Sequence, residues 1–318
     1  GSIDGGATGL NTLTGGNVAN TWALTGTNAG TVTGVGGTFS NIQNLTGGSS
    51  TDTFTGGGGS ITGALTDGAG TSTLNSTLLV GSASLTGAVA LGSNTAITTS
   101  GGGNILFGST VDGAGNTLGL TAGTGSITFT GAVGGGGALG AITINSALNV
   151  GAAAITAASL TQSAGTGTTT LNGVVTSTGA VSVTTSTFNN TSTINGTSLA
   201  VIAPTLTDLG DVSVGGGSVT VSGVTSAVDI GTNIGALTAG SLSVTTTGAI
   251  GAITGTNLAA LGTVELNGST VGVTLGTIGT LKGTTSGGLV TDVFNVTATG
   301  ISSVGSIVAN TAPGTHDV

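Results

Sequence analysis

Short runs in which apolar residues alternate with Ser or Thr recur along the whole chain. Successive side chains of a β-strand point to opposite faces, so each run gives a strand with one apolar and one hydroxylated face. The clearest runs cover residues 126–130, 141–145, 181–184, 218–222 and 242–245. We expect their apolar residues to stack in a core: Ile127, Phe129, Ile142, Ile144, Val181, Val183, Val219, Val221, Leu242 and Val244.

Turn residues separate these runs, and helix signals are nearly absent. The breaks contain Gly, Asn, Asp or Ser, as in Asn172-Gly173 and Asn195-Gly196, and such dipeptides favour tight turns. Glycine makes up 66 of the 318 residues. Because each glycine inside a helix would cost about 1 kcal/mol relative to alanine, the pattern predicts an all-β chain with almost no helix.

The spacing of the runs favours a parallel β-helix (β-solenoid) over a sandwich or a propeller. Strand centres lie roughly 7–15 residues apart throughout the chain. Only 2% of the residues are aromatic, and the narrow interior of a solenoid suits stacked Val, Ile, Leu and Ala. If one coil takes about 20–25 residues, the chain makes roughly 13–15 coils.

Composition divides the chain into three segments. Residues 1–75 are the richest in glycine and are expected to form Gly-rich solenoid coils. Residues 76–311 carry more regular Val, Thr and Leu strands and are expected to form one continuous solenoid, and residues 312–318 resemble a linker. The chain begins with Gly1 rather than Met, which we interpret as a segment of a longer repeat array.

Charge excludes several classes of partner. The net charge is −9, and Lys282 is the single basic residue besides one histidine. Nucleic-acid binding needs cations that displace phosphate counterions, so we expect no nucleic-acid partner.

We also expect no membrane insertion, because the longest apolar run, residues 198–204, is far shorter than a membrane-spanning segment and ends in proline. The absence of cysteine fits a secreted protein that is stable without disulfides.

Part of the first segment resembles a known repeat. Residues 1–6 (GSIDGG), 19–26 (ANTWALTG), 39–48 (FSNIQNLTGG) and 52–54 (DTF) resemble a repeat of giant bacterial surface proteins, the filamentous-haemagglutinin-like adhesins and related β-strand-repeat proteins. The resemblance implies an extracellular bacterial β-helix that adheres or forms fibres, and it implies no catalytic residues. Trp22, Phe39 and Phe54 are our candidates for an exposed contact patch.

Asp52 is the candidate metal ligand. Residues 47–55 (GGSSTDTFT) come close to the calcium-binding pattern G-G-x-G-x-D-x-U-x, with Ser50 in place of the fourth-position glycine. The similar turns at 67–74 and 112–118 lack the matching aspartate. Calcium takes six to eight oxygen ligands, so we favour the alternative, in which Asp52 forms a turn and the chain has no cofactor.

The ionisable residues give little support for catalysis. Asp208 and Asp211 could act as a carboxylate pair, but residues 207–211 also form an ordinary turn pattern. His316 is the single histidine, and the adjacent Asp317 could not easily orient it in an extended tail. We therefore expect the protein not to be an enzyme.

Thr-x-Thr sequences suggest another surface function. They occur at 51–53, 128–130, 191–193, 205–207 and 245–247. Flat threonine ladders resemble ice-binding solenoids, but the spacing here is uneven, and threonine also simply suits exposed strand faces.

These observations predict a structural protein outside the cell. We expect a subunit or segment of a bacterial surface fibre whose partner is itself, end to end through open strand edges or side by side. The alternative is an adhesin stalk that binds a glycan or a cell surface. A further alternative is an ice-binding or polysaccharide-acting β-helix.

Overall fold

A computed structural model describes residues 1–226, 228–229, 237–251, 258–259, 261–268, 271–285 and 294–309. These residues form strands, turns and bends, and they contain no helix. Accordingly, no helix of membrane-spanning length and hydropathy occurs among them. The chain divides into two compact units, Gly1–Gly167 (unit 1) and Thr168–Val318 (unit 2). The change of composition near residue 75 falls inside unit 1, and the predicted tail, 312–318, lies outside the described residues.

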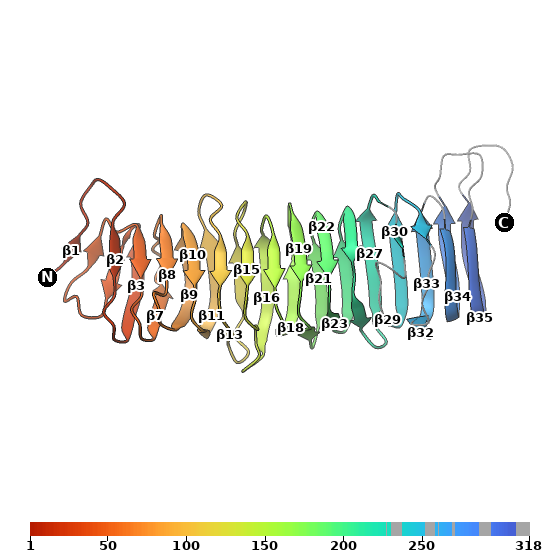
Figure 1. Ribbon diagram of the computed structural model, residues 1–318, viewed down its shortest axis with the longest axis horizontal. Coiled ribbons are helices and arrows are strands. Elements are labelled where there is room, and N and C mark those ends of the chain that lie inside the picture. The colour runs from red at the N-terminus through yellow and green to blue at the C-terminus, as the bar shows by residue number, and fades with distance from the viewer. Residues whose placement is uncertain are drawn as a thin grey trace. The chain divides into compact units, whose positions relative to one another are not determined.

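Unit 1 consists of stacked coils in which each strand pairs with the equivalent strand of the next coil (Figure 1). Its strands are β1 (Ile3–Asp4), β2 (Thr12–Thr14), β3 (Asn20–Gly26), β4 (Ala29–Val32), β5 (Phe39–Ser40), β6 (Asn44–Thr46), β7 (Asp52–Gly56), β8 (Ala64–Thr66), β9 (Ser72–Val80), β10 (Ser82–Leu85), β11 (Val89–Thr99), β12 (Ile105–Phe107), β13 (Val111–Asp112), β14 (Leu118–Thr121), β15 (Ile127–Phe129), β16 (Leu139–Ser146), β17 (Val150–Ala152) and β18 (Ile155–Gln162).

Unit 2 repeats this arrangement in three parallel ladders. One ladder contains β19, β22 and β25, a second runs from β20 through β23, β26 and β29 to β32, and a third runs from β21 to β35. In addition, β28 pairs with β31, and β31 pairs with β34 of the third ladder. The strands are β19 (Thr168–Leu171), β20 (Val175–Ser177), β21 (Ala180–Thr184), β22 (Thr187–Asn190), β23 (Thr193–Asn195), β24 (Ser198–Ile202), β25 (Thr205–Asp208), β26 (Asp211–Ser213), β27 (Ser218–Val224), β28 (Val228–Asp229), β29 (Leu237–Thr238), β30 (Ser241–Thr246), β31 (Ile250–Gly251), β32 (Leu258–Ala259), β33 (Leu261–Gly268), β34 (Val271–Thr285) and β35 (Phe294–Ala309).

The parallel register confirms the predicted β-solenoid. Leu45 pairs with Leu65, and Leu242 pairs with Val264, so that in each case the partner comes one turn later in the chain. Counted by the ten-stranded sheet alone, with one strand a turn, the described residues make about ten turns, and the ladder from β21 to β35 carries further coils beyond β25. The first turn, from Leu13 to Leu45, is longer than the next one, from Leu45 to Leu65. No later described strand extends the β19–β25 ladder.

The interior of both units is a stack of apolar side chains in register. The residues at the predicted core positions are 0–3% exposed: Ile127, Phe129, Ile142, Ile144, Val181, Val183, Val219, Val221, Leu242 and Val244. Phe107 and Phe129, register partners in β12 and β15, stack with ring centroids 5.0 Å apart. Burying each such side chain contributes about 1.5–3 kcal/mol before conformational entropy is counted. No single coil is therefore stable alone.

Asparagine side chains at the corners tie each coil to the next. Asn44 Oδ1 accepts a hydrogen bond from the backbone N–H of Ala64 (2.9 Å), and Asn104 Oδ1 accepts one from Ser126 (2.8 Å). The donors lie 20 and 22 residues further along the chain, which is one turn of the solenoid. These bonds pair backbone groups at the corners, where the strand ladder is interrupted.

Candidate functional site

The predicted contact patch is wrong, because its three aromatic residues are buried. Trp22 and Phe39 are 0% exposed and Phe54 is 2% exposed. The ring centroid of Trp22 lies 6.0 Å from that of Phe54 in a stacked arrangement and 6.3 Å from that of Phe39 in an edge arrangement. They form an aromatic core between the first two coils and cannot touch a partner directly.

The strand pairing around β3 explains this burial. In it, β3 pairs in parallel with β7 and also folds back on β4 as an antiparallel hairpin. Gly30 in β4 lies against the carbonyl of Ala23 and the ring of Phe39, so that a Cβ at this position would overlap both. The indole N–H of Trp22 finds no hydrogen-bond partner there.

Asp52, the calcium candidate, is completely buried, and both its oxygens are occupied. Oδ1 accepts hydrogen bonds from the backbone N–H of Asn20 (3.2 Å) and from Asn20 Nδ2 (2.6 Å), and Oδ2 accepts one from the N–H of Gly48 (2.6 Å). Among the described residues, no three His, Asp or Glu side chains gather where a metal ion could bind. The arrangement makes Asp52 a connector between the first two coils.

Asp67 has the same role, although the sequence pattern did not single it out. It is 0% exposed. Its Oδ1 accepts hydrogen bonds from the backbone N–H (2.9 Å) and hydroxyl (3.0 Å) of Thr86, and its Oδ2 accepts one from the N–H of Gly87 (2.6 Å). The donors come from the following coil, so only knowledge of the coil length could have indicated them.

Asp208 and Asp211, the candidate carboxylate pair, flank a turn between two strands of unit 2. Asp208 ends β25 and Asp211 begins β26, and these strands belong to different ladders. Asp208 Oδ1 accepts a hydrogen bond from the N–H of Gly210 (2.8 Å), which closes the turn. Gly210 has a φ of 62°, a left-handed conformation that favours glycine. His316, the other catalytic candidate, lies outside the described residues.

The Thr-x-Thr sequence at residues 128–130 is not part of a threonine ladder at Thr128. Its register partners on the neighbouring coils are Leu106 and Gly151. A hydroxyl column does exist at another place, which the five sequences named above do not include. It comprises Thr14, Thr46, Thr66 and Ser84 on four successive coils.

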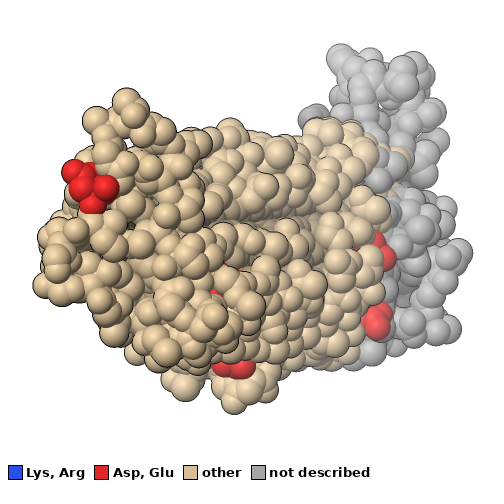
Figure 2. Space-filling view, turned by 60° about the vertical axis from the view of Figure 1, so that its left-hand side comes forward, with Lys and Arg blue, Asp and Glu red and all other residues tan. Residues whose placement is uncertain are grey.

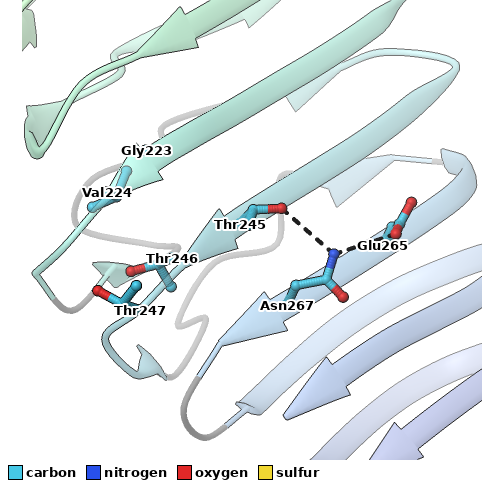
Figure 3. Close-up of a pocket in the computed structure, with 7 residues that line it drawn as sticks. All are labelled: Gly223, Val224, Thr245, Thr246, Thr247, Glu265 and Asn267. Atoms are coloured by element: carbon cyan, nitrogen blue, oxygen red, sulfur yellow. Dashed lines mark hydrogen bonds between the residues drawn. The ribbon is translucent and has the colours of Figure 1, made fainter. Parts of the chain in front are cut away.

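A groove lined by described residues of unit 2 is a candidate for ligand binding (Figure 3). It has a volume of about 470 Å³ and is lined by Gly223, Val224, Thr245, Thr246, Thr247, Glu265 and Asn267. Asn267 Nδ2 donates to Glu265 Oε1 (3.2 Å) and to Thr245 Oγ1 (3.5 Å). The side chain of Glu265 is exposed, and its register partner in β34 is Lys282. Carboxylate, amide and hydroxyl groups side by side can exchange hydrogen bonds with a polyhydroxylated ligand.

A second groove of about 380 Å³ lies on unit 1, over β9, β11, β14 and β16. Ala96 and Gly119, register partners on β11 and β14, are part of its lining. Thr77 and Thr143 continue the same row, and Asn94 also contributes to the wall. No ionisable residue is among those that line this groove.

The exterior carries little charge. On the face shown in Figure 2, acidic side chains appear as a few separate patches on a surface of uncharged residues. Comparisons with protein-family models, with curated proteins and with solved structures give no match. The resemblance of residues 1–75 to giant bacterial adhesins therefore stays a prediction, because a β-solenoid fold alone does not identify a family.

Proposed function

We propose that the chain is a non-enzymatic structural segment of an extracellular bacterial surface fibre. The observation that carries the proposal is the continuous parallel ladder, in which an apolar residue of one coil stacks on an apolar residue of the next, as in Ile105 on Ala83. Such a stack transmits load from coil to coil through backbone hydrogen bonds. It needs no ligand.

The chemistry of the surface supports the same role. Exposed Ser and Thr do not titrate, and charged residues are only 3% of the chain, so that neighbouring chains repel one another little. The buried carboxylates Asp52 and Asp67 are engaged by backbone and side-chain donors. These features suit a protein whose surface changes little with pH, and they support a location outside the cell.

Electron microscopy of the purified protein at rising concentration tests the fibre proposal. We expect filaments or bundles of uniform width as concentration increases. Compact single particles at every concentration would refute assembly by this chain alone. Analytical ultracentrifugation of the same samples gives the size distribution independently of the microscope grid.

An adhesin that binds a glycan is the second candidate, and the groove at Glu265 and Asn267 favours it. A glycan array tests it, with Asn267→Ala as the variant that removes the amide from the groove. Asn145→Ala is the matched control, because Asn145 makes the same kind of bond to Thr121 Oγ1 (2.9 Å) on unit 1. Binding that Asn267→Ala abolishes and Asn145→Ala preserves supports the adhesin. If the intact protein binds no glycan on the array, the result counts against the adhesin.

A further inference from the structure

Three Asn-Gly pairs occur in the chain, at residues 172–173, 195–196 and 267–268. Such a pair can react with itself, because the backbone nitrogen of the glycine can attack the side-chain carbonyl carbon (Cγ) of the asparagine. Glycine favours this attack, since it has no Cβ to hinder the approach and its backbone is the most flexible. The three pairs share this local chemistry, so the fold decides which of them reacts.

The pair at 195–196 is held in a parallel ladder. Asn195 is the last residue of β23, and its register partners are Thr176 and Ser213 on the two neighbouring coils. The N–H of Gly196 donates to the carbonyl of Ser213 (3.0 Å). The nitrogen that would have to attack is therefore engaged, and reaction requires local opening of the ladder.

The pair at 267–268 is also held. Both residues lie in β33 and pair with β34. The side-chain amide of Asn267 donates to Glu265 Oε1 (3.2 Å) and to Thr245 Oγ1 (3.5 Å) (Figure 3). These side-chain bonds and the strand pairing must give way before Cγ of Asn267 can turn toward the nitrogen of Gly268.

The pair at 172–173 lies outside the strands. β19 ends at Leu171 and β20 begins at Val175, so Asn172 and Gly173 belong to the corner between two ladders. Asn172 is exposed to solvent. Within the described part of unit 2, the N–H of Gly173 donates to no acceptor. No bond of this unit therefore restrains the attacking nitrogen, and water reaches the side chain.

We propose that Asn172 is a site of spontaneous covalent modification, at which the chain gains a carboxylate. The nitrogen of Gly173 forms a bond to Cγ of Asn172, the Cγ–Nδ2 bond breaks, and the proton of the Gly173 N–H leaves with the amide group as ammonia. Water then adds to one of the two carbonyl carbons of the cyclic imide and breaks its bond to nitrogen. The reaction consumes one water and releases one ammonia, and it needs no oxidant and no enzyme.

The two ways of opening the imide give two products. One is an aspartate in the original backbone, and the other is an isoaspartate, in which the backbone runs through the side-chain methylene. Either product adds one negative charge to a chain with ten acidic residues and a single lysine, so ion exchange separates it from the unmodified protein. The proposal does not rest on the proposed fibre, because it concerns the chemistry of one corner.

Incubation of the folded chain at mildly alkaline pH, followed by digestion with pepsin and mass spectrometry of the peptides, tests the proposal. Pepsin acts at acidic pH, where removal of the N–H proton is slow, and so adds little conversion of its own. We expect Asn172 to convert at least about tenfold faster than Asn195 and Asn267, because those two react only from locally opened states. Equal rates at the three positions, or no conversion at Asn172, would overturn the proposal.

The same chain unfolded in guanidinium chloride is the matched control. The three asparagines should then convert at similar rates, since no ladder protects any of them. If Asn172 kept its full advantage in the unfolded chain, its neighbours in the sequence and not the fold would be the cause, and the structural argument would be refuted.

A glycine variant gives a second arm. Gly173→Ala should slow conversion at Asn172 in the folded protein, because the added Cβ hinders the attack, and it should leave Asn195 and Asn267 unchanged. Conversion at Asn172 at an unaltered rate in this variant would refute attack by the nitrogen of residue 173. None of these measurements depends on whether filaments form.

Discussion

Trp22 in β3 and Phe54 in β7 are register partners on neighbouring coils, and their rings stack with planes 15° apart. Both side chains are buried. Since the chain has no tyrosine and no other tryptophan, the fluorescence of Trp22 reports on the first coil alone. A shift of its emission to longer wavelength marks the opening of that coil.

Truncation of this aromatic core should destabilise unit 1 locally. Trp22→Ala should cost about 3–5 kcal/mol, the usual range for large aromatic side chains in cores. Trp22→Phe should cost less, because it keeps a ring against Phe54 and removes an indole N–H that has no partner. Hydrogen exchange measured by mass spectrometry checks both variants. We expect faster exchange in β3 and β7 and little change beyond the next few coils, since coils contact mainly their neighbours.

Loss of a buried carboxylate should destabilise more than loss of a half-buried one. Asp67→Ala leaves the N–H groups of Thr86 and Gly87 without an acceptor, at roughly 1–3 kcal/mol for each group that stays buried. Asp112→Ala is the control. Asp112 accepts from the N–H groups of Gly136 and Gly137, but it is only half-buried, so water can replace it. Urea denaturation followed by circular dichroism should show the larger loss for Asp67→Ala, and equal losses would contradict the role assigned to Asp67.

Replacement of glycine by alanine should change the stability of the protein differently at two strand positions. At Gly56 in β7, a Cβ would overlap the carbonyl of Thr77 on the next coil, so Gly56→Ala forces the two coils apart. At Gly151 in β17, no atom lies within 4 Å of the position a Cβ would take. We expect a lower thermal midpoint for Gly56→Ala and an unchanged or slightly higher one for Gly151→Ala, because alanine restricts the unfolded chain. The reverse order would show that the coils are not in contact at Gly56.

Asp4 should titrate below its ordinary pKa of 3.8, because the Asn41 side chain and the Gly6 N–H hydrogen-bond its carboxylate. A lowered pKa stabilises the fold above the unfolded value, and that contribution is lost as the pH falls through the folded value. Asn41→Gly removes the larger cause while keeping a residue that tolerates the φ of 57° at this position. NMR titration should then show the pKa of Asp4 rising toward 3.8. An unchanged midpoint in the variant would rule out the bond to Asn41 as the cause.

The fold could be predicted because alternation and coil length are local properties of the sequence. Ile142 and Ile144 alternate with Thr143, and this alone places the two isoleucines inside. The burial of the aromatic residues could not be predicted, because Trp22 is covered by the β3–β4 hairpin and by the rings of Phe39 and Phe54, which come from later parts of the chain. The roles of Asp52 and Asp67 could not be predicted from the sequence either, because the groups that donate hydrogen bonds to them include residues one turn of the solenoid away.

The equal step between three successive register partners has a consequence for the gene. Ala83 pairs with Ile105, and Ile105 pairs with Ile127, at equal intervals along the chain. A deletion of residues 105–126 would place Ile127 where Ile105 stood, with its neighbours still aligned. Recombination between repeats can thus lengthen or shorten the protein by whole turns while every remaining rung keeps a partner, so that its reach can change between generations without a new fold.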